Sequence, residues 1–500
     1  MQKRTIFSFF VIIFSIAGCG SNNKKNAAVP VAPAHLAALV NGTAVRLVWN
    51  RSGGALSYNV YYMLSSDLSF TRLGSTGFTS VTISGLVSGE TYNFAVTALN
   101  DAGASGYSNE AGVTLISGVP ADLKTISGDQ RVMLRWNASS GATSYGVYVS
   151  NMVNGVPFIN AGFTTTTAYT VTGLTDGTSY GFVVTAVNAG GESGFSNQIN
   201  CIPVITKVYA TRGFVPVRIA IDSSNNIWVT NISSGTVTNI NPATGVTAGT
   251  YNAGSTPGDL AIDSTGNVWI ANTYYGSVTE VNPAGAIVGT YTVGGVPEGI
   301  AIDSSDNVWI SDCGNGGVVE LSPSGTILGN YGLGSGFFVG VAIDSSGDVW
   351  VINQLAFTVT EISHAGTLRG TYLVGSTPMG VAIDPSGSAW IVDNGGGTLT
   401  KLSSSGTNQG TFPAGISPTG IAIDSAGEVW FNNYWNNTVT ALSPTGSVIN
   451  VYSVGARPEG IAIDSSGNVW VANSGDNTID ELMGIATGPQ YFPYNGPQWP

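Results

Sequence analysis

The sequence predicts an all-β protein in which two β-sandwiches are followed by a seven-bladed β-propeller. The main observation is a phrase close to Gly-Ile-Ala-Ile-Asp-Ser-Ser-Gly-Asn-Val-Trp-Val-Ala-Asn, which occurs seven times. A period of about 40 residues in a Gly-rich chain is typical of a propeller with one four-stranded blade per repeat. The first residue of each turn and the aromatic residue after it keep this period, at Asp222, Asp263, Asp303, Asp344, Asp384, Asp424 and Asp464, and at Trp228, Trp269, Trp309, Trp350, Trp390, Trp430 and Trp470.

Composition narrows the class of protein. The 500 residues include 68 glycines and only 9% charged residues, and the net charge is −13. Nucleic-acid binding needs clustered Lys and Arg, so no nucleic-acid partner is expected. Three cysteines form no disulfide framework, and no Cys/His cluster has zinc spacing. The sequence therefore predicts no cofactor and no bound metal.

Residues 1–19 have the features of a lipoprotein signal peptide. Lys3 and Arg4 precede an apolar run of about 12 residues, which is a signal h-region rather than a membrane span. The run ends at Ile-Ala-Gly-Cys19, which resembles the bacterial lipobox. That resemblance implies cleavage before Cys19 and lipidation of its thiol. We therefore expect a cell-envelope protein anchored to the membrane by lipid on Cys19, at the outer membrane or cell surface, with residues 20–28 as a flexible tether.

Two segments, 29–116 and 117–203, repeat each other. Trp49 and Trp136 are 87 residues apart, and Tyr92 and Tyr180 are 88 apart. Alternating strands with a core tryptophan and a late tyrosine predict two β-sandwiches. These residues resemble fibronectin type III domains, which implies a spacer or adhesive stalk; ligand binding by the sandwiches is the alternative.

Each propeller repeat reads as four strands. Residues 300–302 form a short apolar inner strand, and residues 303–307 form a turn because Asp, Ser and Asn bond their own backbone. Residues 308–310 form the tryptophan strand. In the preceding repeat, residues 279–281 and 289–293 give the third and fourth strands.

The ends of the propeller, 204–483, predict how the ring closes. Residues 205–209 resemble a fourth strand, and residues 478–482 resemble a third. We expect these two strands to pair, because pairing removes two exposed sheet edges. Residues 484–500 are rich in Pro and Gly and are expected to form an irregular tail.

The phrase Pro-x-Gly-Ile-Ala-x-Asp-x-x-Gly-Asn-Val-Trp resembles NHL-type propellers, and most closely the streptogramin (virginiamycin B) lyases. The resemblance covers about 204–485. It implies a metal and an acid–base pair at one mouth of the ring, with His after the repeat's Pro and Glu after its Trp strand. The positions that follow Pro, or its equivalent, are Val217, Gly258, Glu298, Val339, Met379, Thr419 and Glu459.

None of these seven residues is His, and no Glu closes a Trp strand. The closing residues are Asn231, Asn272, Asp312, Asn353, Asp393, Asn433 and Asn473. The one propeller histidine, His364, falls in a turn expected at the opposite mouth. The sequence therefore assigns no catalytic residue. A metal-dependent lyase or lactonase that uses Asp312, Glu298 or Glu459 as ligands is the alternative.

The residues that break the repeat suggest a binding site. Tyr274 and Tyr275 follow the Trp strand of blade two, and Tyr434 and Trp435 follow that of blade six. The loops that carry them are expected to share one mouth with Glu298, Asp312, Asp393 and Glu459. Aromatic residues beside carboxylates suit a glycan or a peptide. The sequence thus predicts a binding module for a glycan or protein ligand; an aromatic cover over the mouth is the competing interpretation.

Overall fold

The computed structural model describes residues 28–41, 44–153 and 155–486. All regular elements in these ranges are β-strands, which confirms the all-β class. No helix in the described residues has the length and apolar character needed to cross a bilayer. The signal peptide, Cys19, most of the tether and residues 487–500 of the tail lie outside the described residues.

The first sandwich packs a three-stranded sheet, in the order β1-β2-β5, against a sheet in the order β4-β3-β6-β7, with β8 paired to β6. Trp49 is buried between the sheets, with its ring 5.4 Å from that of Tyr58. Tyr92 closes one corner, because its hydroxyl accepts a hydrogen bond from Val87 N at 3.0 Å. The strands are β1 (Ala37–Asn41), β2 (Ala44–Val48), β3 (Ser57–Leu64), β4 (Thr71–Thr76), β5 (Ser80–Ile83), β6 (Thr91–Asn100), β7 (Gly103–Ala104) and β8 (Ala111–Thr114).

The second sandwich repeats this plan, with sheet orders β13-β10-β9 and β12-β11-β14-β15, and with β16 paired to β14. Trp136 is buried 5.3 Å from the ring of Tyr145, as Trp49 is beside Tyr58. Both predicted core tryptophans are therefore confirmed. The strands are β9 (Ala121–Gly128), β10 (Arg131–Asn137), β11 (Ser144–Asn151), β12 (Ile159–Thr164), β13 (Ala168–Thr172), β14 (Tyr180–Asn188), β15 (Gly191–Glu192) and β16 (Ile199–Cys201).

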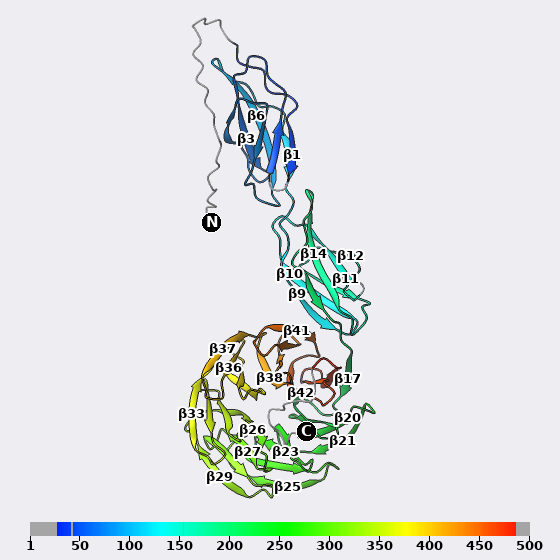
Figure 1. Cartoon of the computed structure of the whole chain (residues 1–500), viewed down its shortest axis with the longest axis vertical. Helices are drawn as coiled ribbons and strands as arrows, with labels where there is room; N and C mark the ends of the chain where they lie inside the picture. Colours follow the sequence, from blue (N-terminus) through cyan, green and yellow to red (C-terminus); the bar gives the residue numbers. More distant parts are fainter. Residues whose placement is uncertain (1–27, 42–43, 154, 487–500) are drawn as a thin grey trace. The chain divides into compact units, whose positions relative to one another are not determined.

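The remaining strands form seven four-stranded antiparallel blades arranged in a ring (Figure 1). The first strand of each blade faces the centre, and each of these inner strands contacts the next in a closed cycle from β18 through β42 and back to β18. The blades are, in order, β18 (Pro216–Ile221), β19 (Ile227–Asn231), β20 (Thr236–Asn241) and β21 (Val246–Asn252); β22 (Pro257–Ile262), β23 (Val268–Asn272), β24 (Ser277–Val281) and β25 (Ile287–Thr292); β26 (Pro297–Ile302), β27 (Val308–Asp312), β28 (Gly317–Leu321) and β29 (Ile327–Gly332); β30 (Phe338–Ile343), β31 (Val349–Asn353), β32 (Thr358–Ile362) and β33 (Leu368–Leu373); β34 (Pro378–Ile383), β35 (Ala389–Asp393), β36 (Thr398–Leu402) and β37 (Asn408–Pro413); β38 (Pro418–Ile423), β39 (Val429–Asn433), β40 (Thr438–Leu442) and β41 (Val448–Ser453); β42 (Pro458–Ile463), β43 (Val469–Asn473), β44 (Thr478–Leu482) and β17 (Thr206–Ala210).

The repeat tryptophans fill the space between consecutive blades. Trp309 of blade three is completely buried and packs against Val341 and Val351 of blade four. Its indole nitrogen donates to Asp303 Oδ2 at 3.1 Å. The other oxygen of Asp303 accepts bonds from the backbone of its own turn, at Ser305 and Asn307. In six of the seven repeats the Asp thus ties its turn to the indole behind it, beside the turn-building role expected from the sequence, whereas the indole nitrogen of Trp430 bonds to no side chain or backbone group among the described residues.

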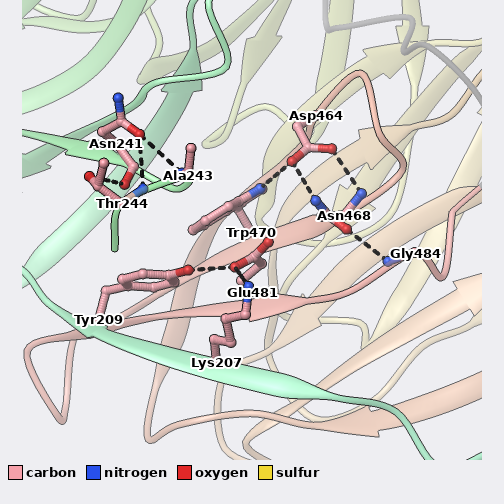
Figure 2. A network of polar contacts seen from close by, with 10 residues as sticks. All are labelled: Lys207, Tyr209, Asn241, Ala243, Thr244, Asp464, Asn468, Trp470, Glu481 and Gly484. Carbon is pink, nitrogen blue, oxygen red and sulfur yellow. Dashed lines mark hydrogen bonds and ion pairs between the residues drawn. The ribbon is translucent and has the colours of Figure 1, made fainter. Parts of the chain in front are cut away.

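Blade seven takes its outer strand from the start of the propeller, as predicted. Strand β17 pairs antiparallel with β44, with Thr206 opposite Leu482 and Ala210 opposite Thr478. Figure 2 shows Tyr209 of β17 donating a hydrogen bond of 2.6 Å to Glu481 of β44. Lys207 forms an ion pair with the same carboxylate at 3.6 Å. The ring is thus closed by a backbone ladder and by side chains from both ends of the propeller.

Candidate functional site

A central cavity of about 720 Å³ lies within the propeller and is lined by the inner strands of all seven blades. The inner strands begin at one end of the ring, where the loops after the second and fourth strands of each blade gather. We call this end the mouth end. Side chains from these loops, including Tyr274, Phe337 and Gln354, complete the lining. The volume falls within the range of pockets that hold small molecules or short segments of polymer.

The second, third and fourth residues of the inner strands line the cavity. The second follows Pro or its equivalent, the third is Gly in five of the seven blades, and the fourth is an aliphatic residue that lines the cavity in every blade except blade two. A Cβ on Gly299 would collide with Val339 O, and one on Gly420 would collide with Glu459 O. Glycine is needed there because adjacent inner strands approach each other so closely. A third-position glycine adds no side chain to the lining, so side chains come from the second and fourth positions in these blades.

Blades one and two depart from this rule. The third position is Arg218 in blade one and Asp259 in blade two. The Asp259 carboxylate accepts bonds from Leu260 N at 3.0 Å and from Ile300 N of the next inner strand at 3.2 Å. Asp259 thus connects two blades while it also lines the cavity.

The charged side chains of the cavity come from four consecutive blades. Glu459 belongs to blade seven, Arg218 to blade one, Asp259 to blade two and Glu298 to blade three. We call these four residues the charged wall. The matching positions of blades four to six carry Val339, Met379 and Thr419, so the facing side of the cavity is uncharged.

The charged wall has more carboxylates than cations. Burial raises the pKa of Asp259, although Arg218 and the two backbone donors act to lower it. Burial also raises the pKa of Glu298, with Asp259 adding to the rise and Arg218 opposing it. A single guanidinium therefore does not fully compensate the carboxylates around it.

Cys313 lies next to this wall. Its thiol donates to Phe338 O at 2.9 Å. Burial, together with the nearby charge of Glu298, raises the pKa of the thiol to about 12. The nucleophile of cysteine chemistry is the thiolate, so Cys313 is not an activated nucleophile. Cys313 and Cys201 are both free thiols.

Three of the eight residues predicted for the mouth line the cavity: Tyr274, Glu298 and Glu459. The Tyr274 side chain is 74% exposed and meets Tyr275 edge-to-face, with ring centroids 5.2 Å apart. Tyr275 instead lines a separate, open hollow between blades one and two, beside Asn272 and Thr290. Two adjacent tyrosines of similar exposure thus belong to different surfaces.

Asp312 and Asp393 end their strands at the mouth end, but both are completely buried and neither lines the cavity. One oxygen of Asp312 accepts bonds from Val296 N, Gly314 N and Asn315 N. Asp393 accepts a bond from the Thr400 hydroxyl at 2.6 Å. The physical reason is local, because these carboxylates accept hydrogen bonds from neighbouring backbone amides or hydroxyl groups.

Tyr434 and Trp435 form an edge-to-face pair with ring centroids 4.8 Å apart. Trp435 is 61% exposed, and the guanidinium of Arg457 lies 5.6 Å from its ring centroid. Neither aromatic residue lines the central cavity. The aromatic residues expected to act together are therefore divided, with Tyr274 at the cavity and the Tyr434–Trp435 pair outside it.

Sequence reasoning missed Arg218 and Asp259. The signal was present, since these two residues replace the glycine that five repeats keep at the same position. The lyase resemblance implies functional histidines at the position after Pro and no functional residue at the next one. Arg218 and Asp259 carry opposite charges in adjacent repeats, at a position where the other repeats have no side chain. This departure from the repeat marks the cavity wall.

The cavity carboxylates do not fit the metal site that the lyase resemblance implies. Among the described residues, the group of three ligand-type side chains close enough to hold one cation is Asp344, Asp348 and Glu361. That group lies at the end of blade four opposite the mouth end, and Arg369 forms an ion pair with Asp348 at 2.7 Å. In the cavity, Arg218 lies among the carboxylates, whereas hard cations need several oxygens to converge on one point.

Comparison with known proteins agrees with this architecture. The sequence model of the fibronectin type III domain matches residues 31–114 and 119–202. An amylopullulanase from Thermoanaerobacter thermohydrosulfuricus is 40% identical over 83 residues, which are 16% of this chain and 6% of that protein. Chitinase A1 from Niallia circulans is 33% identical over 179 residues, 32% of this chain and 24% of that protein. The chain thus spans less than a quarter of the length of either relative.

The propeller resembles solved lyase structures. A streptogramin B lyase superposes with a TM-score of 0.51 and 17% identity, over 55% of this chain and 97% of the other. A catalytically inactive virginiamycin B lyase from Staphylococcus aureus, with quinupristin, has a TM-score of 0.51 and 19% identity, over 56% of this chain and 99% of the other. At these identities the likeness shows the fold alone. The model of the virginiamycin B lyase family, however, matches residues 204–481, more than half of the chain, and the protein therefore belongs to the virginiamycin B lyase family.

Proposed function

We propose that the propeller is a binding module that holds a glycan or peptide in its central cavity, and that it does so without the lyase chemistry of its family. The supporting observation is the cavity of about 720 Å³, with a charged wall on one side and an uncharged wall on the other. Such a combination of apolar surface and a few polar groups suits ligand binding. The position after the repeat Pro, where the family resemblance implies histidines, carries none here.

Tyr274 at the rim provides a direct test. Changing Tyr274 to Ala should weaken retention of ligands from glycan and peptide arrays about tenfold, because an aromatic ring at a binding surface contributes roughly 1–2 kcal/mol. Dissociation constants for the retained ligands, measured by fluorescence anisotropy, give the size of the loss.

The matched control is Tyr275→Ala. Tyr275 is 70% exposed, similar to Tyr274, but lines the separate hollow. Both variants should unfold at the wild-type temperature, since surface substitutions usually change stability by less than about 0.5 kcal/mol. Equal binding by wild type and Tyr274→Ala would show that the cavity rim takes no part. Trp435→Ala tests the outer aromatic pair in the same assay.

Membership in the lyase family keeps an enzymatic alternative, a metal-dependent lyase or lactonase. Asp312 already accepts hydrogen bonds from three backbone amides, so Glu298 and Glu459 are the carboxylates left for this role. Turnover of lactones or cyclic depsipeptides that stops on chelation would favour the enzyme. A protein that retains ligands and leaves them intact would favour the binding module.

We further propose that the protein is a lipid-anchored component of the cell envelope, with the two fibronectin type III domains as the spacer between anchor and propeller along the chain. The support is the lipobox-like stretch that ends at Cys19. Changing Cys19 to Ala should move most of the protein from the membrane fraction to the soluble fraction, because acyl chains provide the attachment. Fractionation followed by immunoblotting measures the shift.

The chain offers a matched control for the anchor. Cys313→Ala also removes one thiol, but from the propeller, and it should leave the protein in the membrane fraction. Membrane retention by Cys19→Ala equal to that of wild type would refute lipidation as the anchor.

A further inference from the structure

The charged wall favours one of the two proposed ligand classes, peptides, over the other, glycans. We propose that the cavity takes a ligand with an ammonium or guanidinium group on an apolar body, of which a short basic peptide is the simplest example. This inference rests on the proposed binding function and narrows it. It depends on the cavity lining and on the division of charge around the ring.

The cavity is lined by more carboxyl groups than cations. Asp259, Glu298 and Glu459 bring three carboxyl groups to the cavity, and Arg218 brings one cation. The Asp259 carboxylate already accepts two backbone hydrogen bonds. Glu298 and Glu459 are thus the wall carboxylates available to a ligand, and they come from blades on opposite sides of Arg218 and Asp259. A cavity lined by an excess of one charge attracts ligands of the opposite charge.

The carboxylate of Glu298 is not fully compensated by a cation of the protein. Burial raises the pKa of Glu298, and Asp259 adds to the rise while Arg218 opposes it, so the charged form of Glu298 is disfavoured. A bound cation next to Glu298 would compensate that charge where Arg218 does not. Hydrogen bonds to charged partners in a buried site are also stronger than those between neutral groups.

The side of the cavity that faces the charged wall is mainly apolar. Val339, Met379 and Phe337 present apolar surface, with Thr419 as a polar neighbour. An apolar body would bury carbon against this side while its cation reaches the charged wall. Among the described lining residues, Tyr274 at the rim and Phe337 offer the flat aromatic surface that suits a neutral sugar, so the interior favours the peptide.

The binding experiment uses the full-length protein immobilised on a surface. The probe is a pool of end-capped hexapeptides that each carry one lysine among apolar residues. Its matched control is the same pool with every lysine acetylated, which removes the charge and keeps the chain. A set of neutral chito- and cello-oligosaccharides forms the second arm. We expect the lysine pool to bind at least tenfold more tightly than its acetylated copy, with an affinity that falls as salt is raised.

Two isosteric variants locate the site. Glu298→Gln and Glu459→Gln should each weaken binding of the lysine pool about tenfold, and should leave binding of the acetylated pool unchanged. Glu110→Gln removes the same charge from an exposed position of the first sandwich and should have no effect. The salt and acetylation measurements use the wild-type protein, so they test the inference even where a variant is unstable.

The outcomes separate the inference from the function on which it rests. Oligosaccharides or acetylated peptides that bind as tightly as the lysine pool would overturn the inference and leave the binding module in place. Lysine-selective binding that survives both Glu→Gln changes would overturn the assignment to the charged wall. Absence of binding in every arm would overturn the proposed function itself.

Discussion

Replacing Trp309 with Ala is expected to destabilise the propeller by about 3–5 kcal/mol, the usual cost of removing a large aromatic side chain from a packed core. Trp309 is completely buried, and its ring lies 5.4 Å from that of Tyr331 in a stacked arrangement. The change opens a cavity between blades three and four and removes the indole donor from Asp303. Urea unfolding followed by near-ultraviolet circular dichroism measures the loss.

Trp435→Ala is the control, because it removes the same side chain from an exposed loop outside the repeat. Trp435 is 61% exposed, and its contacts are to Tyr434 and Arg457. Its removal should change the free energy of unfolding by less than about 1 kcal/mol. Similar losses from the two variants would contradict the role of the repeat tryptophans as wedges between blades.

The contrast between these tryptophans shows why so much of the fold could be predicted. A residue that recurs every 40 or 41 positions occupies the same place in all seven blades, so features peculiar to one repeat do not obscure the pattern. The same period predicts the pairing of residues 205–209 with 478–482, since the last repeat lacks a fourth strand and the first segment resembles one. The β17–β44 ladder confirms that prediction.

The site was harder to predict because it depends on positions that differ from blade to blade. Asp312 and Asp393 lie at the expected end of their strands, but the direction of a side chain is set by loop packing. The repeat held a clue, since the same position is Asn in the other five blades. Asn and Asp share the ability to cap a loop, and a position that alternates between them is more often structural than ligand-binding.

A second replacement within the repeat carries the other large expected effect. Asp480 of β44 takes the position that is Thr400 in blade five, and its side chain is only 3% exposed. Burial raises its pKa from the ordinary 3.8 to about 6, although Gly455 N donates to its carboxylate at 2.7 Å. The neighbouring charge of Asp476 contributes to the rise.

The sign of the pH effect follows from these values. Between about pH 3.8 and pH 6 the folded protein holds a proton on Asp480 that the unfolded chain has released. The contribution of this group to stability is therefore fully present below pH 3.8 and is lost as the pH rises through 6. A shift of about two pKa units corresponds to about 3 kcal/mol.

Asp480→Asn removes the titrating group and keeps the shape of the side chain. The difference in the free energy of unfolding between the variant and wild type should grow in favour of the variant by about 3 kcal/mol from pH 4 to pH 7, because only the wild type loses the contribution of Asp480 in this window. Urea unfolding of both proteins at pH 4, 5, 6 and 7 measures the difference, in which the other carboxyl groups cancel.

Asp101→Asn, at an exposed turn of the first sandwich, reports the effect of removing one surface carboxylate. Its difference from wild type should stay nearly constant with pH, whereas that of Asp480→Asn should grow. Parallel pH profiles for wild type and Asp480→Asn would mean that Asp480 ionises in the folded ring as easily as in the unfolded chain. The bond from Gly455 and the amide of Asn473 would then outweigh burial, and blade seven would hold a stable buried charge.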